Sequence, residues 1–134
     1  MSDPSYELQA ALVAALKADA ALSALIAGRI YDAVPTDAVF PYVSLGPCQV
    51  LPMRAGCIDG AEVYPQIDVW SRAVGFPECK RIAKALVAAL DDQDLAVSDH
   101  HTVLFDHQST NYLRDPDGKT SHAAILFHGS FTSL

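Results

Sequence analysis

The sequence predicts an α+β fold of order α-β-β-α-β-β, with a mainly antiparallel four-stranded sheet and two helices packed on one of its faces. Three observations lead to this fold class: a central run of alternating residues, two stretches with apolar residues at helical spacing, and a strong turn signal between two alternating stretches near the C-terminus. The 134 residues are 51% hydrophobic, which is enough for one buried core. We therefore expect a single domain spanning residues 1–134.

The first helix is predicted to begin with Asp3 as its cap and Pro4 at the first helical position. Leucine and alanine residues then recur every three or four positions until about residue 18, which produces one apolar stripe. The helix either continues through Asp19 or breaks there, in which case Asp19 caps the second part. Gly28 supplies the left-handed residue that ends it.

The next two segments are predicted to be a short strand and a long loop. Residues 41–46 place Val43 and Leu45 on one face of the strand, and Pro47 ends it. Residues 49–60 show no period and contain a proline and two glycines. Long loops in compact domains are often functional, although a mobile surface loop without a specific partner explains this segment equally well.

The central strand is predicted over residues 62–72, the longest alternating run in the chain. Val63, Ile67 and Val69 point to one face, as expected for a strand with one buried side. The opposite face carries acidic, basic and aromatic side chains together: Glu62, Tyr64, Gln66, Asp68, Trp70 and Arg72. Such a face indicates a surface that meets another protein. In the alternative assignment the two faces are reversed and Trp70 belongs to the core.

The second helix is predicted to begin at residues 75–77 and to end near Asp91 and Asp92, whose charges oppose the helix dipole. Its apolar stripe consists of Cys79, Ile82, Ala83, Leu86 and Leu90.

The chain is predicted to finish with a β-hairpin. Residues 102–113 alternate loosely, with Val103 and Phe105 on one face, and residues 122–131 alternate in return. Between them, the sequence RDPDGK at 114–119 combines a proline that presets φ with a glycine that accepts positive φ.

Composition limits the function classes. The formal charge is −7 and no basic cluster is dense enough to predict a nucleic-acid-binding surface. We expect no signal peptide, and Lys17 and Asp19 interrupt the apolar start well before the roughly 20 residues of a membrane span, so we expect no membrane partner. Three cysteines without a CxxC pattern predict free thiols in a protein made in the cytosol.

No catalytic residue, cofactor or metal site is predicted. The acidic residues at 91–99 indicate a solvated connection, and neither a GxSxG nor a phosphate-binding loop is present in the sequence. Cys79 lies on an apolar helix stripe, where a thiol is unreactive. The alternative is a small ligand- or metal-binding enzyme domain using histidines that could approach each other near the hairpin: His107, His122 and His128.

Four motifs in order resemble one protein family: GRIYD at 28–32, PYVSLG at 41–46, IDVWSR at 67–72 and RDPDG at 114–118. They are similar to the small tail completion proteins of long-tailed bacteriophages, also called tail terminator or tail-to-head joining proteins, which gene transfer agents also carry. The resemblance covers nearly the whole chain.

The resemblance implies a structural virion protein rather than an enzyme. It implies a ring, typically a homo-hexamer, that caps the tail tube, ends tube polymerisation and joins the tail to the head or neck. Its expected partners are further copies of itself, the tail tube protein and a head-tail connector or neck protein. DNA would pass through the lumen without specific binding, which an acidic ring would favour if the acids line the hole. The expected location is the tail-neck junction, after a stage in the host cytoplasm, and a neighbouring neck or connector protein is the alternative.

Two sets of residues are candidates for contacts in such an assembly. The subunit-interface candidates are Tyr64, Asp68, Trp70, Arg72 and Arg114, because aromatic area and charge pairs fix the register of an interface. The candidates for docking on the tail tube or neck protein are Gln49, Val50, Leu51, Met53, Arg54, Ile58 and Asp59.

Overall fold

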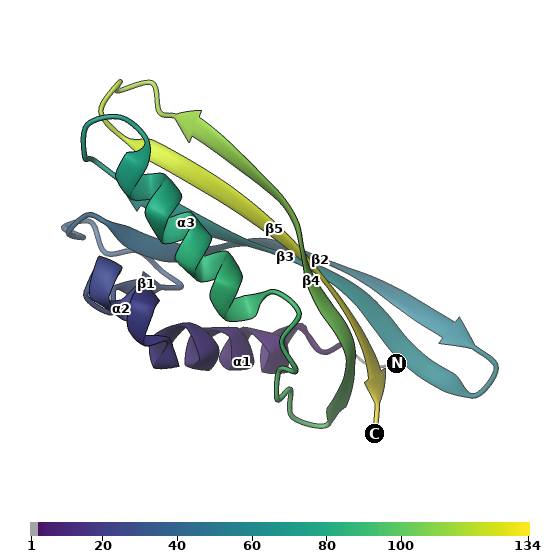
Figure 1. Cartoon of the computed structure of the whole chain (residues 1–134). Helices are drawn as coiled ribbons and strands as arrows, with labels where there is room; N and C mark the ends of the chain where they lie inside the picture. Colours follow the sequence, from purple (N-terminus) through teal and green to yellow (C-terminus); the bar gives the residue numbers. More distant parts are fainter. Residues whose placement is uncertain (1–2) are drawn as a thin grey trace.

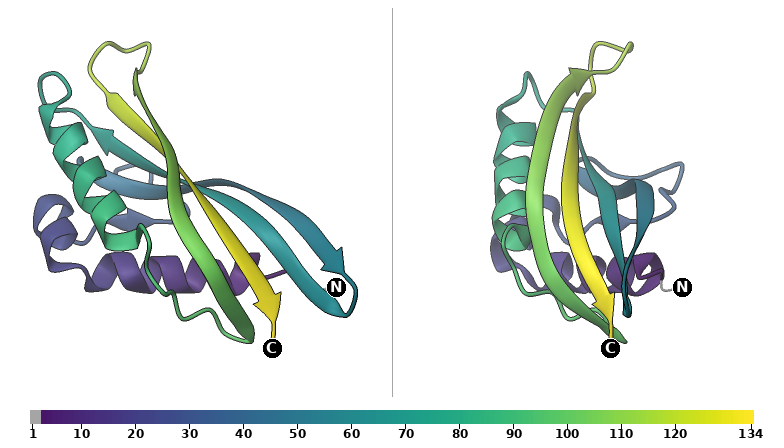
Figure 2. Two further views of the ribbon diagram at one scale, coloured as in Figure 1. Left: turned by 45° about the vertical axis from the view of Figure 1, so that its right-hand side comes forward. Right: turned by 90° about the vertical axis from the view of Figure 1, so that its right-hand side faces the viewer.

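The computed structural model describes residues 3–134 as a twisted five-stranded sheet with three helices on one face (Figures 1 and 2). The helices are α1 (Ser5–Ala18), α2 (Ala20–Ile26) and α3 (Pro77–Leu90). The strands are β1 (Ile30–Tyr31), β2 (Tyr42–Ala55), β3 (Ile58–Ser71), β4 (His100–Arg114) and β5 (Ser121–Ser133). They lie in the order β1-β2-β3-β5-β4, and every neighbouring pair is antiparallel except the parallel pair β1 and β2.

The α+β class is confirmed, but the predicted four strands and two helices are each one too few. The missed strand, β1, pairs with only Val43 and Ser44 of β2, and two residues are too short to show a period. The additional helix arises because the first helical segment breaks at Asp19, which has extended backbone angles, and α1 and α2 are bent by 81°. The Asp19 carboxylate accepts a hydrogen bond of 2.9 Å from the Leu22 N–H and so caps α2.

The ends of this helical segment differ by one residue from the prediction. Pro4 is the residue before the helix rather than its first residue, and Asp3 Oδ1 accepts a 2.9 Å hydrogen bond from the Ser5 N–H. At the other end, Ala27 already has φ 52, and Gly28 follows with φ 69. Within residues 3–134, no single helix is long and apolar enough to cross a membrane; only the bent pair α1 and α2 reaches that length and composition together.

The prediction of a strand ending at Pro47 and of a loop over residues 49–60 is wrong. β2 continues past Pro47 through a bulge between Leu45 and Cys48 and stays paired with β3 down to Ala55 and Ile58. The prolines are tolerated because β1 covers only the start of β2, so the rest of β2 is a sheet edge that needs no further N–H donors. We call residues 49–60, the distal part of this hairpin, the arm; it projects beyond the helices in Figures 1 and 2.

The core lies between the helices and the sheet, as the periodicities predict. Val63, Ile67 and Val69 of β3 are completely buried, as is the predicted stripe of α3. They pack with the inward residues of β5 and the leucines of α1 and α2: Ala123, Ile125, Phe127, Phe131, Leu8, Leu12, Leu16 and Leu22. The face of the sheet away from these helices, which we call the outer face, carries no helix within the described residues (Figure 2).

The C-terminal hairpin is confirmed, with one correction in β4. A bulge between Thr102 and Leu104 removes Val103 from the face of Phe105: Val103 is 55% exposed, whereas Phe105 is 1% exposed. The predicted turn closes through a 2.9 Å hydrogen bond from the Asp115 N–H to the Thr120 carbonyl, with Gly118 at φ 71.

Candidate functional site

The outer face contains three of the predicted interface residues. Tyr64, Asp68 and Trp70 all lie on it, because they alternate with the buried residues of β3. Trp70 is outside the hydrophobic core cluster, so the predicted face assignment is confirmed and the reversed one is wrong. Arg72 and Arg114 lie elsewhere, at the ends of β3 and β4.

A cluster of hydrogen-bonded side chains surrounds Trp70. Its indole stacks on His122 of β5, with ring centroids 3.9 Å apart and planes 8° apart, and its Nε1–H donates a 2.9 Å hydrogen bond to Ser44 Oγ. Asp68 Oδ1 accepts 2.9 Å from Gln66 Nε2 and lies 2.7 Å from His122 Nε2. We call these five residues the Trp70 cluster. Asp68 is 6% exposed, and the two contacts of its Oδ1 hold the Gln66 and His122 side chains in place.

A second pair lies further along the same face. His128 Nε2 is 2.7 Å from Glu62 Oε1, and its ring stacks on Tyr64 with centroids 4.9 Å apart. Partial burial raises the Glu62 pKa, but hydrogen bonds from Ser130 and His128 and the charge of His128 outweigh it, so the pKa lies below its ordinary value. These contacts form a polar, aromatic surface that is ordered within one subunit.

The histidines are not gathered into one site. His122 and His128 belong to these two separate pairs on the outer face, whereas His107 Nε2 contacts Thr110 Oγ1 at 2.7 Å and its ring packs against Phe127. Over residues 3–134, no group of three histidine, cysteine or acidic side chains could hold a metal ion.

Arg72 and Arg114 are brought together at one end of the sheet. With Lys119 they line a recess of about 410 Å³ between the β3–α3 connection and the β4–β5 turn. Arg72 Nε donates a 3.2 Å hydrogen bond to Thr120 Oγ1, and its guanidinium lies 4.2 Å from the centre of the Phe40 ring. The Arg114 guanidinium lies 4.5 Å from the Phe76 ring, so aromatic side chains support both groups. We call this the cationic recess.

The predicted docking residues form the arm instead of a loop. Leu51 and Met53 of β2 and Ile58 of β3 are 43%, 49% and 57% exposed. Arg54 and Asp59 face each other in the strand register, and Val50 packs against the core. The arm therefore presents exposed apolar side chains on a regular hairpin, in a form that can add area to another protein surface.

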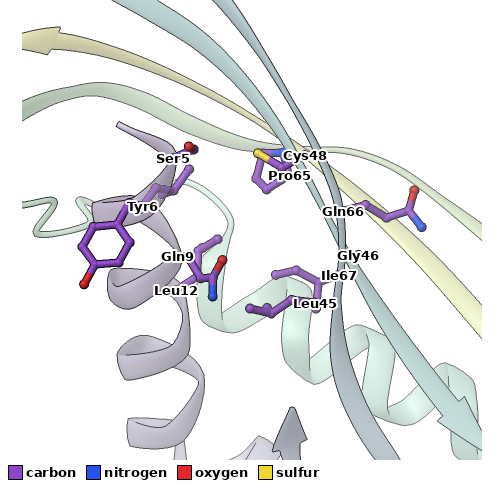
Figure 3. A pocket seen from close by; sticks show the side chains of 11 residues that line it. Ser5, Tyr6, Gln9, Leu12, Leu45, Gly46, Cys48, Pro65, Gln66 and Ile67 are labelled. Atoms are coloured by element: carbon purple, nitrogen blue, oxygen red, sulfur yellow. The ribbon is translucent and has the colours of Figure 1, made fainter. Parts of the chain in front are cut away.

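The cavity in Figure 3, about 320 Å³, lies between the start of α1 and the base of the arm. Its surface is mainly apolar, and eleven residues line it: Ser5, Tyr6, Leu8, Gln9, Leu12, Leu45, Gly46, Cys48, Pro65, Gln66 and Ile67. These residues contain no nucleophile paired with a base. The buried thiol of Cys79, on α3, has its pKa raised to about 11 by burial and the nearby charge of Glu78, so it stays protonated.

Sequence reasoning missed the partners of the predicted residues. Ser44 and His122 complete the Trp70 cluster, and Phe40, Thr120 and Lys119 complete the cationic recess. The alternation of β5 places His122 and the buried Ala123 on opposite faces of the sheet, so the sequence pattern could have indicated that His122 lies on the outer face. However, its contact with Trp70 depends on β5 lying beside β3, and no local pattern reports strand order.

Comparisons with known proteins add three findings. The family model described as Tail completion protein gp17 matches residues 10–129. No curated protein matches the chain. Among solved structures, the chain is similar to a protein in the virion of a native gene transfer agent (GTA) particle, with a TM-score of 0.92 and 30% sequence identity, covering 99% of this chain and 100% of that chain.

Proposed function

Because the chain belongs to the tail completion protein gp17 family, and is thus a structural protein of a phage or gene transfer agent tail, we propose that it forms a hexameric ring that caps the tail tube. In this proposal the ring ends tube polymerisation and joins the tail to the head or neck at the tail-neck junction, while DNA passes through its lumen. Subunits would gather there from the host cytoplasm. The observation that carries the proposal is the likeness to a virion protein over 99% of this chain.

Such a ring needs contacts between its subunits and contacts with the tail tube or neck protein, and the structure offers a distinct surface for each. A closed ring with identical subunits uses two different patches on each copy. We assign the subunit contact to the outer face around Tyr64 and Trp70 and to the cationic recess with Arg72 and Arg114. In this assignment Asp68 contributes by holding the Trp70 cluster in place.

The arm is assigned to the tail tube or neck protein. It continues the sheet beyond the helices, so it can reach a partner above or below the ring without separating the subunits (Figure 1). Its exposed Leu51, Met53 and Ile58 supply apolar area, and Arg54 and Asp59 supply polar contacts beside them. The proposal assigns the chain no catalytic role.

The first experiment measures the native mass of the purified protein, alone and after mixing with the tail tube protein encoded beside it. A species six times the subunit mass, free or formed on tubes whose growth it stops, supports the proposal. A monomer that leaves tube length unchanged contradicts it. Binding to the neck protein without any effect on tubes would favour a connector role instead.

A further inference from the structure

The charges of the subunit are distributed unevenly between its two ends. Five of the nine basic residues gather at the start of α3: Arg72, Arg114 and Lys119 in the cationic recess, and Lys80 and Arg81 on the first turns of the helix. Lys80 Nζ lies 5.7 Å from the same Phe76 ring that supports Arg114, so these groups are neighbours. Glu78, Asp115 and Asp117 lie at the same end, so five basic and three acidic residues leave it with an excess of positive charge in a chain of net charge −7.

The opposite end of α3 carries only acids. The connection over residues 91–99 contains Asp91, Asp92, Asp94 and Asp99 and no lysine or arginine. It begins where α3 ends, while the β4–β5 turn and the start of α3 lie at the other end of the molecule (Figure 1). We call residues 91–99 the acidic connection.

Neither set of charges forms an ion pair within the described residues, although the charge of Arg72 acts on Asp117 of the β4–β5 turn and helps to lower its pKa. Both ion pairs of the described residues involve a histidine, His122 or His128, and none joins the five cations or the four aspartates to an opposite charge. All nine side chains are exposed. Among the four aspartates, only the Asp91 side chain makes a hydrogen bond within residues 3–134: its Oδ1 accepts a 2.8 Å bond from the His107 N–H.

The cationic recess is built to receive a carboxylate. Two guanidinium groups and one ammonium group line a concave site, and guanidinium binds carboxylates through paired N–H donors. The Arg72 Nε bond to Thr120 and the aromatic contacts of both arginines hold the guanidinium groups in place before any partner arrives, which lowers the entropy cost of binding.

We propose that the cationic recess of one copy receives the aspartates of the acidic connection of the next copy around the ring. This inference rests on the proposed ring and names the partner of the recess. A head-to-tail ring requires two complementary patches on one chain, and the recess and the acidic connection are such a pair. They lie at opposite ends of α3 in one subunit, so only a second copy brings them together.

Charge-reversal variants test the pairing without disturbing the fold. The recess variant is Arg114→Glu with Lys119→Glu, and the acidic variant is Asp92→Lys with Asp94→Lys. Arg72 and Asp91 are left unchanged because they hold Thr120 and the His107 N–H. Each variant alone should reduce ring formation roughly tenfold or more, since it places like charges opposite each other.

Complementation separates this contact from a general effect of charge. An equimolar mixture of the two variants should form rings of alternating subunits, because each reversed recess then meets a reversed connection. A chain carrying all four substitutions should also form rings. The matched control, Lys17→Glu with Asp37→Lys, reverses exposed charges that belong to neither site and should form rings as the unmodified chain does.

Three results overturn the inference. Folded variants that assemble normally when alone contradict the contact between recess and acidic connection. So do variants that fail to assemble in the mixture while the unmodified chain forms rings. Both results leave the ring proposal intact. Variants that form rings but lose binding to the tail tube, the neck protein or DNA would assign the recess to that partner instead. An unmodified chain that forms no ring in the presence of tubes refutes both the ring and this contact.

Discussion

At the scale of single residues, Trp70 shows how an exposed sheet face becomes an ordered surface. The indole contacts neighbours on the two flanking strands, donating a hydrogen bond to Ser44 of β2 and stacking on His122 of β5. Aromatic side chains that are held in one rotamer lose little entropy when they bind a partner. Trp70 is therefore suited to an interface because its own subunit already fixes it.

The hydrogen bond between Trp70 and Ser44 should be measurable as a coupling energy. Trp70→Phe keeps a ring on His122 but leaves the Ser44 hydroxyl, 6% exposed, without its donor, and should lower the free energy of unfolding by about 1 kcal/mol. Ser44→Ala should cost a similar amount, and the double variant should cost less than the sum of the two. Urea denaturation of the four proteins measures this, and strictly additive losses would contradict the bond.

Asp117 should make the β4–β5 turn sensitive to acid. The N–H groups of Lys119 and Thr120 and the Thr120 hydroxyl lower its pKa from 3.8 to about 2. Because the folded pKa is below the unfolded one, this stabilisation is complete above about pH 4 and is lost as the pH falls towards 2.

Asp117→Ala should therefore lower the Tm near neutral pH, and its difference from the unmodified protein should shrink towards pH 2. The control is Asp94→Ala. It removes an exposed carboxylate that makes no hydrogen bond within residues 3–134, so its difference in Tm from the unmodified protein should not change towards pH 2. Thermal scans across this pH range provide the measurement. A difference that stays constant with pH would refute the role of the charge.

At the scale of elements, the arm is the clearest departure from the sequence prediction. Proline and glycine are frequent in loops, yet here they occupy an edge strand and a tight turn. Its stability comes from pairing with β3, whereas its exposed apolar side chains contribute little to the core. An element of this kind can lose surface side chains without unfolding.

Replacing Leu51, Met53 and Ile58 by serine should therefore separate folding from docking. We expect the Tm to change little, because these side chains are about half exposed, whereas binding to the tail tube or neck protein should fall at least roughly tenfold. Val39→Ser, at 62% exposure outside the arm, is the matched control. Unchanged binding by the triple variant in a pull-down with both partners would remove the arm from the docking surface.

At the scale of the whole molecule, one apolar layer between sheet and helices holds the surfaces in position. Ile67, near the middle of β3, is completely buried in this layer, between the outer face and the helices. The sheet carries the arm at one end and the cationic recess at another, so their relative placement depends on this packing.

Ile67→Ala should cost about 2–5 kcal/mol, because it leaves a cavity in a close-packed core. Leu25→Ala, at a helix position that is 39% exposed, is the control and should cost much less. Urea unfolding followed by circular dichroism measures both. A loss below 1 kcal/mol for Ile67→Ala would show that the core can collapse around the gap.

Much of this architecture was readable from the chain, because helical and strand periods are local properties of sequence. The α3 stripe, the buried residues of β3, the C-terminal turn and the outward position of Trp70 were all predicted and are confirmed. Four short motifs also indicated the family to which the chain belongs. The interface and docking roles of the named residues remain proposals.

What the tertiary structure alone decided is which segments lie together. β5 lies beside β3 and places His122 under Trp70, although 52 positions separate them, and the β4–β5 turn meets the β3–α3 connection to form the cationic recess. The arm likewise depends on β2 finding β3 as its partner. Periodicity determines which face of an element is buried, but strand order follows from the packing of the whole core, which no local pattern encodes.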